Sequence, residues 1–391
     1  MLSIATFPAL LPTFIAEWSL TKTDAGWLNG IYYIGYMAAV PVLVSLTDRV
    51  SARKIYYLCM VLTMVANVGF AFLVEGFWSA FVFRIVAGIA LAGTYMPGLK
   101  LMGDFLKAMA GDKDQSRAVA FYTSSFGIGS ALSFYLSGVV ATALDWHWAF
   151  GLATAGPAAA MVLIAVMLPR KDPALTETPT THFLDFRPVL RCRAAMGYVL
   201  AYTAHNFELF AFRSWIVTYF VFAAATGPGD TLGWSATAIA AVINLLGLPS
   251  SVLGNEVSRR FGRHRTITTV MLCSAVLACV LGFSASWPFW LVVLLSLAYG
   301  CTVTGDSGSI TAGVVAAAPT GYRGATMAVH SCIGFIGASG GPLMFGVMLD
   351  LAGPSGGGET ILSWGVAFAF TGAVVTLGPL ALALLREKRN D

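Results

Sequence analysis

Charged residues are scarce in this sequence. Asp, Glu, Lys and Arg make up 11% of its 391 residues, while 57% of the residues are hydrophobic. Soluble domains carry about 25% charged residues, so a water-soluble globule of this size would need far more polar surface. A disordered chain is excluded as well, because disorder goes with low hydrophobicity and high net charge. The composition therefore predicts a protein that crosses a membrane several times.

Motifs for several kinds of chemistry are also missing. No GxxxxGK[ST] loop is present to cradle the phosphates of ATP, so ATP-driven transport is not expected. The six cysteines form no CxxC pair, and no cluster of His, Cys and Asp has metal-ligand spacing. The string GDSGS at 305–309 resembles a serine-protease nucleophile motif, but that enzyme needs β-barrels and an aqueous cleft. We therefore expect no enzyme, no metal and no cofactor.

Long apolar runs dominate what is present. A bilayer core about 30 Å thick needs roughly 20 apolar residues per helix. Twelve such runs lie at about 2–19, 24–46, 54–75, 77–106, 117–143, 147–168, 194–223, 231–256, 265–286, 287–316, 320–350 and 361–385. They lack the ten-residue alternation of an outer-membrane barrel, so each run is predicted to be a helix. The first begins at Met1 without a basic segment or a cleavage site, and we expect it to be retained.

The basic residues predict the orientation of these helices. Nineteen of the 23 Lys and Arg residues lie in segments on one side of the membrane, and only Lys22 lies in a loop on the other side. Because Lys and Arg accumulate in cytoplasmic loops, both termini are predicted to be cytoplasmic, in a bacterial inner membrane. The basic residues are spread over six loops, so we expect no nucleic-acid partner. We expect the chain to be a monomer in the lipid bilayer.

The chain divides into two similar halves. Its longest polar interval, 169–193, contains three prolines and separates six runs from six. VSLTDRVSARK, Val44–Lys54, matches NEVSRRFGRHR, Asn255–Arg265, and Arg117 at the start of one run matches Arg323 at the start of another. Matches in the same order indicate a duplicated unit. We predict an N-terminal six-helix bundle at 1–168, a cytoplasmic linker at 169–193 and a C-terminal bundle at 194–391.

These motifs resemble the major facilitator superfamily. That family has a G-x-L-a-D-R-x-G-R-R/K loop between its second and third helices, and this chain keeps Asp48, Arg49, Arg53 and Lys54 there. RIVAGIALAGTYMPG at 84–98 resembles the family's fourth helix, and 322–353 resembles its eleventh. The resemblance implies an all-α membrane protein of twelve transmembrane helices in two pseudo-symmetric six-helix bundles. It also implies a central cavity that opens to each side of the membrane in turn.

In such a protein the loop motifs would act as gates on the cytoplasmic side. The predicted gating residues are Asp48, Arg49, Arg53, Arg260, Arg263 and Arg323. The alternative is that these residues are ordinary charges of cytoplasmic loops.

Ionisable side chains inside the bilayer are costly and therefore mark functional sites. In the run at 194–223, Tyr202, His205 and Arg213 fall on one helix face, with Asn206 and Glu208 beside it. A face of this kind cannot lie against lipid. We expect Tyr202, His205, Asn206 and Arg213 to bind substrate and Glu208 to carry a proton. The alternative is a polar cluster that packs the bundle.

Other membrane-embedded polar residues extend this hypothesis. The family resemblance implies that Arg84 lines the central cavity, although it could also reach the outer interface. Tyr32 and Tyr36 would line the cavity or belong to the interface. Asp306 and His330 are candidates for proton coupling, and helix packing is the alternative for both.

The sequence thus predicts a secondary active transporter that works by alternating access as a symporter or antiporter. Arginine matches carboxylate or phosphate, so a small anionic or zwitterionic solute moved together with a proton is the favoured substrate. The alternative is proton-driven efflux of amphipathic or cationic compounds, with the same carboxylates binding the cation.

Overall fold

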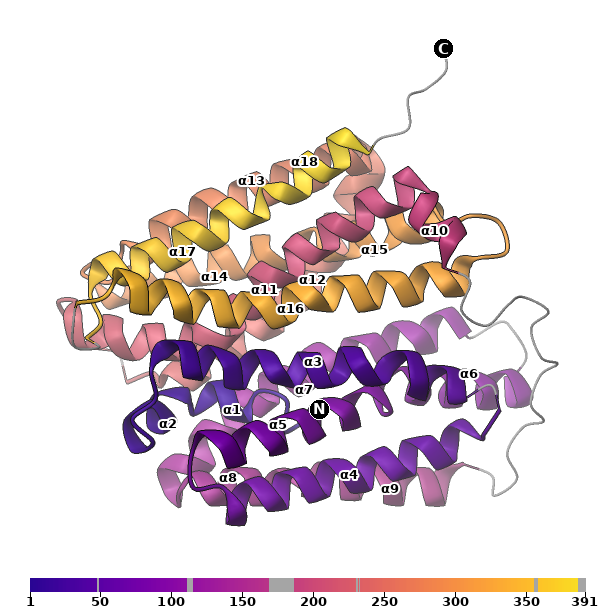
Figure 1. The fold of residues 1–391 in the computed structure, drawn as a ribbon, viewed down its shortest axis with the longest axis horizontal. Coiled ribbons are helices and arrows are strands. Elements are labelled where there is room, and N and C mark those ends of the chain that lie inside the picture. The colour runs from indigo at the N-terminus through magenta and orange to yellow at the C-terminus, as the bar shows by residue number, and fades with distance from the viewer. Residues whose placement is uncertain are drawn as a thin grey trace. The chain divides into compact units, whose positions relative to one another are not determined.

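The computed structural model describes residues 1–47, 49–110, 115–168, 186–229, 231, 233–354 and 358–385, and all regular structure within them is helical (Figure 1). The helices up to the predicted linker are α1 (Thr6–Ala9), α2 (Leu11–Glu17), α3 (Lys22–Leu46), α4 (Ala52–Leu73), α5 (Phe77–Ala92), α6 (Tyr95–Ala110), α7 (Gln115–Ala143), α8 (Trp146–Ala153) and α9 (Ala155–Met167). Those after it are α10 (Arg187–Arg191), α11 (Arg193–Thr226), α12 (Ala236–Phe261), α13 (Arg263–Gly282), α14 (Phe289–Gly305), α15 (Ser307–Ala316), α16 (Arg323–Ala352), α17 (Ile361–Val375) and α18 (Leu377–Leu384).

Among the described residues, eleven helical segments are long and apolar enough to cross a membrane. They correspond to eleven of the twelve predicted runs. The first run differs, because it forms the short helices α1 and α2 instead of one long helix. Pro12 explains the break, since proline has no N–H to donate to the carbonyl one turn earlier.

In four of the other runs the helix has a short break, but each run still forms one candidate membrane span. The breaks lie between α5 and α6, α8 and α9, α14 and α15, and α17 and α18. Thr94, Thr154 and Thr376 occupy three of them, and each hydroxyl donates to the carbonyl three residues earlier, at 3.0, 2.5 and 2.6 Å. A side chain that bonds the backbone in this way competes with the regular helical pattern. Asp306 occupies the fourth break.

Contacts divide the chain into two compact units. The first unit contains Met1–Leu10 and Ile31–Thr181, and the second contains Leu11–Gly30 and His182–Asp391. Helix α3 is therefore shared, its first turns belonging to the second unit. The division into bundles at 1–168 and 194–391 stays a prediction, and most of the predicted linker, 169–185, lies outside the described residues.

Aromatic rings form the core of the first unit. Phe70 of α4 stacks on Phe150 of α8, with ring centroids 4.0 Å apart, and meets Phe7 and Trp146 edge-on. Such pairs stabilise a core beyond the area they bury. Helices α4 and α8 are thereby fixed beside the N-terminal segment.

In the second unit, α11 lies along α16 (Figure 1). A Cβ atom added at Gly337 would collide with the carbonyl of Thr203, and one at Gly341 with the carbonyl of Phe207. Small residues let two helix backbones approach closely in a membrane. The indole of Trp215 donates to the carbonyl of Pro342 at 2.9 Å and completes this contact.

The first turn of α3 has an unusual cap. Asp350, near the end of α16, accepts hydrogen bonds from the backbone N–H of Lys22 at 3.1 Å and of Thr23 at 2.7 Å. The hydroxyl of Thr23 donates to the same carboxylate at 2.6 Å, and the ammonium of Lys22 pairs with Glu359. A carboxylate distant in sequence thus satisfies the free N–H groups of this helix end, where negative charge is also favourable.

Candidate functional site

The centre of the second unit holds a buried pair of ionisable side chains. Nδ1 of His205, midway along α11, lies 2.7 Å from Oδ1 of Asp306. The two side chains are 1% and 2% exposed. Neither atom makes a well-aligned hydrogen bond, and Nε2 of His205 has no hydrogen-bond partner among the described residues. Asp306 reaches this position because it occupies the break between α14 and α15.

Tyr202 links this pair to a second histidine. Its ring stacks on His330 of α16 with centroids 3.9 Å apart, and on His205 with centroids 5.7 Å apart. The histidines are close enough for their charges to interact. Nδ1 of His330 has no hydrogen-bond partner among the described residues. The sequence placed Tyr202 and His205 on one helix face, and the contact between α11 and α16 brings His330 to the same face.

Glu208, three residues after His205 on α11, is buried as well. Its Oε1 accepts hydrogen bonds from Ser274 of α13 at 2.8 Å and from the phenol of Tyr299 of α14 at 3.0 Å. Thr302 donates to Ser274 at 3.3 Å and extends the network. Glu208 is also close enough to Asp306 for their charges to interact. Four helices therefore contribute to one chain of titratable and polar groups.

Asn206 and Arg213 have different surroundings. The amide of Asn206 donates to the carbonyl of Gly334 at 3.1 Å, which ties α11 to α16. Cζ of Arg213 lies 5.8 Å from the ring centroid of Phe210. The Arg213 guanidinium is also close enough to interact electrostatically with Tyr202. The predicted roles of both residues in substrate binding stay predictions.

The first unit contains a cavity of about 240 Å³. Arg84 of α5 lines it and is 4% exposed. Its Cζ lies 4.5 Å from the ring centroid of Tyr32 and 4.7 Å from that of Phe7, so cation–π contacts hold the guanidinium. Tyr32 also lines this cavity, whereas Tyr36 is buried but is not among the described lining residues, and the predicted roles of both in substrate binding stay predictions.

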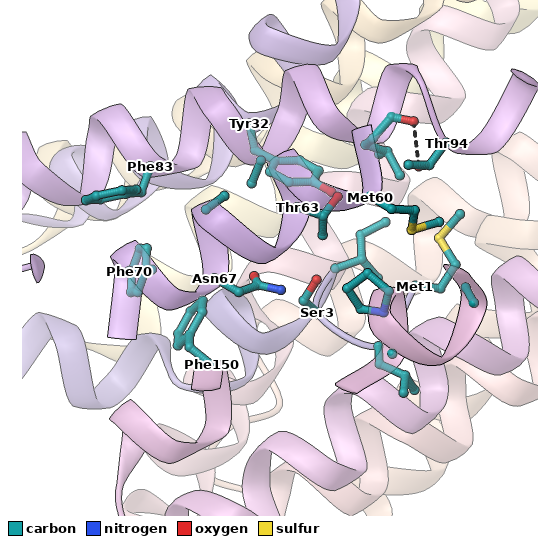
Figure 2. A pocket seen from close by; sticks show the side chains of 18 of the residues that line it. Met1, Ser3, Tyr32, Met60, Thr63, Asn67, Phe70, Phe83, Thr94 and Phe150 are labelled. Carbon is teal, nitrogen blue, oxygen red and sulfur yellow. Dashed lines mark hydrogen bonds between the residues drawn. The ribbon is translucent and has the colours of Figure 1, made fainter. Parts of the chain in front are cut away.

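Polar and aromatic side chains form the rest of this cavity. Figure 2 shows Asn67, Thr63 and Ser3 directed into the same space, with Phe70 and Phe150 on one side. Asn67 is 4% exposed, and its Nδ2 has no hydrogen-bond partner among the described residues. The sequence alone does not indicate that Asn67, Ser274 and Tyr299 belong to a site, because a single polar residue in an apolar run gives no signal by itself.

Those predicted gating residues that the structure describes are exposed or half-buried. Asp48 lies outside the described residues, and Arg49 and Arg323 are exposed. Cζ of Arg53 lies 5.1 Å from the ring centroid of Phe105. Nε of the exposed Arg260 lies 3.8 Å from Glu256.

Arg263 lines an open groove of about 400 Å³ in the second unit. Arg49 and Arg323 belong to different contact units. Gating by this set stays a prediction.

Comparison with known proteins identifies the family. The model of the Major Facilitator Superfamily matches residues 1–342. Protein spinster homolog 1 of Bos taurus is 24% identical over 319 residues, which cover 76% of this chain and 58% of that protein. The niacin transporter NiaP of Acinetobacter baylyi is 24% identical over 42% of this chain and 36% of its own length. The phosphoglycerate transporter protein of Salmonella typhimurium is 22% identical over 90% of this chain and 80% of its own length.

Solved structures share the fold. The nucleoside transporter NupG has a TM-score of 0.71 at 17% identity, covering 99% of this chain and 98% of that one. A bacterial homolog of the human lysosomal transporter Spinster, in an inward-facing and unoccupied conformation, has a TM-score of 0.71 at 14% identity, covering 98% and 93%. The aligned region spans only 58% of the length of Protein spinster homolog 1 and 36% of the length of NiaP. This all-helical, multi-pass membrane protein belongs to the Major Facilitator Superfamily, a family of transporters and not of enzymes.

Proposed function

We propose that the chain is a secondary active transporter that carries a small anionic or zwitterionic solute by alternating access and is coupled to protons. Its family and the transporters among its relatives support transport. Two relatives are named for phosphoglycerate and niacin, which both carry acidic groups. We place the chain in a bacterial inner membrane with both termini in the cytoplasm, as the distribution of Lys and Arg predicts.

The buried guanidinium of Arg84 at the cavity wall carries the proposal for an anionic group. A guanidinium is always charged and binds carboxylate or phosphate through two parallel hydrogen bonds. Two rings hold it in place, so little side-chain entropy remains to be lost on binding. Charged side chains at membrane depth are rare and typically mark functional sites.

The second unit favours an anion over a cation. A cationic substrate would need a free carboxylate, but Asp306 already lies against His205 and Glu208 already accepts two hydroxyl groups. The same arrangement supports proton coupling. A proton that joins or leaves the His205–Asp306 pair changes the charge of a buried site, and that change can favour one conformation over another.

A binding screen tests the proposed function. Purified protein in detergent is heated with carboxylates, phosphates, amino acids and amphipathic cations, and the unfolding temperature is recorded. We expect anions or zwitterions to raise the unfolding temperature of the wild type. Arg84→Gln should weaken their binding about 10- to 100-fold, the usual size of a lost charged hydrogen bond.

Two variants make the result specific. Arg84→Lys keeps the charge and should retain part of the binding. Arg191→Gln removes an exposed arginine at the end of α10 and should leave binding unchanged. Stabilisation by cations alone, lost in Asp306→Asn, would instead establish efflux of cationic compounds.

A further inference from the structure

We propose that the cavity of the first unit selects a compact organic monoanion with a flat apolar body, and that Asn67 recognises a hydrogen-bond acceptor on that body. This inference rests on the proposed function and narrows its substrate class. It departs from the sequence expectation in excluding zwitterions and in assigning a role to Asn67.

The charges of the cavity limit the ligand to one negative charge. Arg84 is the single side chain with a formal charge among the described residues that line it, and the α-amino group of Met1 also lines the cavity, where burial lowers its pKa and disfavours its charged form. No Asp or Glu is in that set, so the ammonium group of a zwitterion would lose its water without gaining a counter-charge. A second carboxylate on the ligand would meet the same difficulty. Burying an unpaired charge is far more costly than burying a neutral group.

Asn67 is the second, independent observation. Its amide is buried, points into the space shown in Figure 2, and has an Nδ2 without a hydrogen-bond partner among the described residues. Buried polar groups are nearly always hydrogen-bonded. An acceptor on the ligand would satisfy this donor, and a ligand without one would leave the donor unpaired.

The walls and the volume define the body of the ligand. Phe70, Phe83 and Phe150 line the cavity together with Met60 and Tyr32. Aromatic walls favour flat rings, which can stack or meet them edge-on. The volume of about 240 Å³ lies below the range of about 300–1,000 Å³ typical of small-molecule pockets. The cavity therefore fits a single substituted ring rather than a nucleoside or a lipid.

The experiment uses pairs of substituted benzoates of equal size, titrated calorimetrically into the purified full-length chain. For charge, 4-ethylbenzoate is compared with the zwitterion 4-(aminomethyl)benzoate, and 4-acetylbenzoate with the dianion terephthalate. We expect the monoanion of each pair to bind at least tenfold more tightly. For the acceptor, the three isomers of methoxybenzoate are compared with the matching ethylbenzoates. We expect one methoxy isomer to bind about three- to tenfold more tightly, as one neutral hydrogen bond allows.

Variants assign these differences to residues. Asn67→Leu should abolish the preference for methoxy over ethyl while keeping the preference for monoanions. Asn244→Leu is the matched control, because Asn244 is another asparagine that is 4% exposed and lies in the second unit. Arg84→Gln should weaken binding of every benzoate about 10- to 100-fold. If Asn67→Leu does not fold, Asn67→Ser serves in its place.

The outcomes separate this inference from the proposed function. If zwitterions or dianions bind as tightly as monoanions, and still require Arg84, the inference is wrong and the proposed function stands. An unchanged methoxy preference in Asn67→Leu would overturn the role of Asn67. Absence of any Arg84-dependent binding, both here and in the broader screen, would overturn both proposals.

Discussion

Asp306 occupies a break between two helices, and its carboxylate is paired with an imidazole rather than with a permanent cation. An imidazole can carry or release a proton, whereas a guanidinium stays charged in proteins. If Asp306 couples proton movement to transport, an uncharged replacement should separate the two processes.

We therefore predict that Asp306→Asn loses gradient-driven accumulation but keeps exchange of substrate across the membrane. Proteoliposomes loaded with the anion found by screening would show a drop in accumulation of at least tenfold, with labelled exchange within about twofold of wild type. Glu75→Gln, at an exposed carboxylate in the loop before α5, is the control and should behave as wild type. Accumulation that persists in Asp306→Asn would show that proton coupling lies elsewhere.

At the scale of residues, periodicity predicted which side chains of α11 share a face but not what they contact. His205 and Tyr202 were correctly placed on one stripe, because 100° per residue fixes their directions. Their partners Asp306 and His330 lie more than 100 residues further along the chain, so only tertiary packing brings them into contact. Asn67 could not be predicted as a cavity residue, because its significance lies in having no partner.

Glycine spacing is the main determinant of packing at the scale of helices. In α16, Gly337 lies against the backbone of Thr203, whereas the nearest atom to a Cβ at Gly340 would be 3.7 Å away in the ring of Phe207. The first position leaves no room for a methyl group, and the second offers ordinary van der Waals contact.

Gly337→Ala should accordingly destabilise the protein by about 1–3 kcal/mol, the usual cost of overpacking. Gly340→Ala in the same helix should be neutral or slightly stabilising, because alanine favours helix by up to about 1 kcal/mol over glycine. Thermal unfolding of the purified variants in detergent measures both. Equal unfolding temperatures for the two variants would contradict the close packing of α11 on α16.

Helix positions were predicted well from apolar runs, and helix interruptions were not. Run length requires only hydrophobicity, which the sequence displays directly. The breaks at Thr94, Thr154 and Thr376 depend on hydroxyl groups that bond the preceding turn. Threonine is common in membrane helices without causing a break, so its presence alone predicted nothing. Pro12, in contrast, was a visible reason to divide the first run.

The whole molecule is organised by charge as well as by hydrophobicity. If the distribution of Lys and Arg sets the orientation, residues 169–193 and the segment near 229 must face opposite sides of the membrane. A green fluorescent protein inserted in 169–193 should fluoresce, and alkaline phosphatase fused after Gly229 should be active. Alkaline phosphatase inserted in 169–193 should be inactive, and green fluorescent protein fused after Gly229 should not fluoresce. Activity in this exchanged pair would reverse the predicted orientation.

The cap on α3 imposes an order on the making of this protein. Asp350, the acceptor for the backbone N–H groups of Lys22 and Thr23, leaves the ribosome 328 and 327 residues after them. Throughout most of synthesis, the beginning of α3 must rely on water or lipid headgroups for those bonds. The newborn chain therefore completes the hydrogen bonds at the start of α3 only when α16 has been inserted.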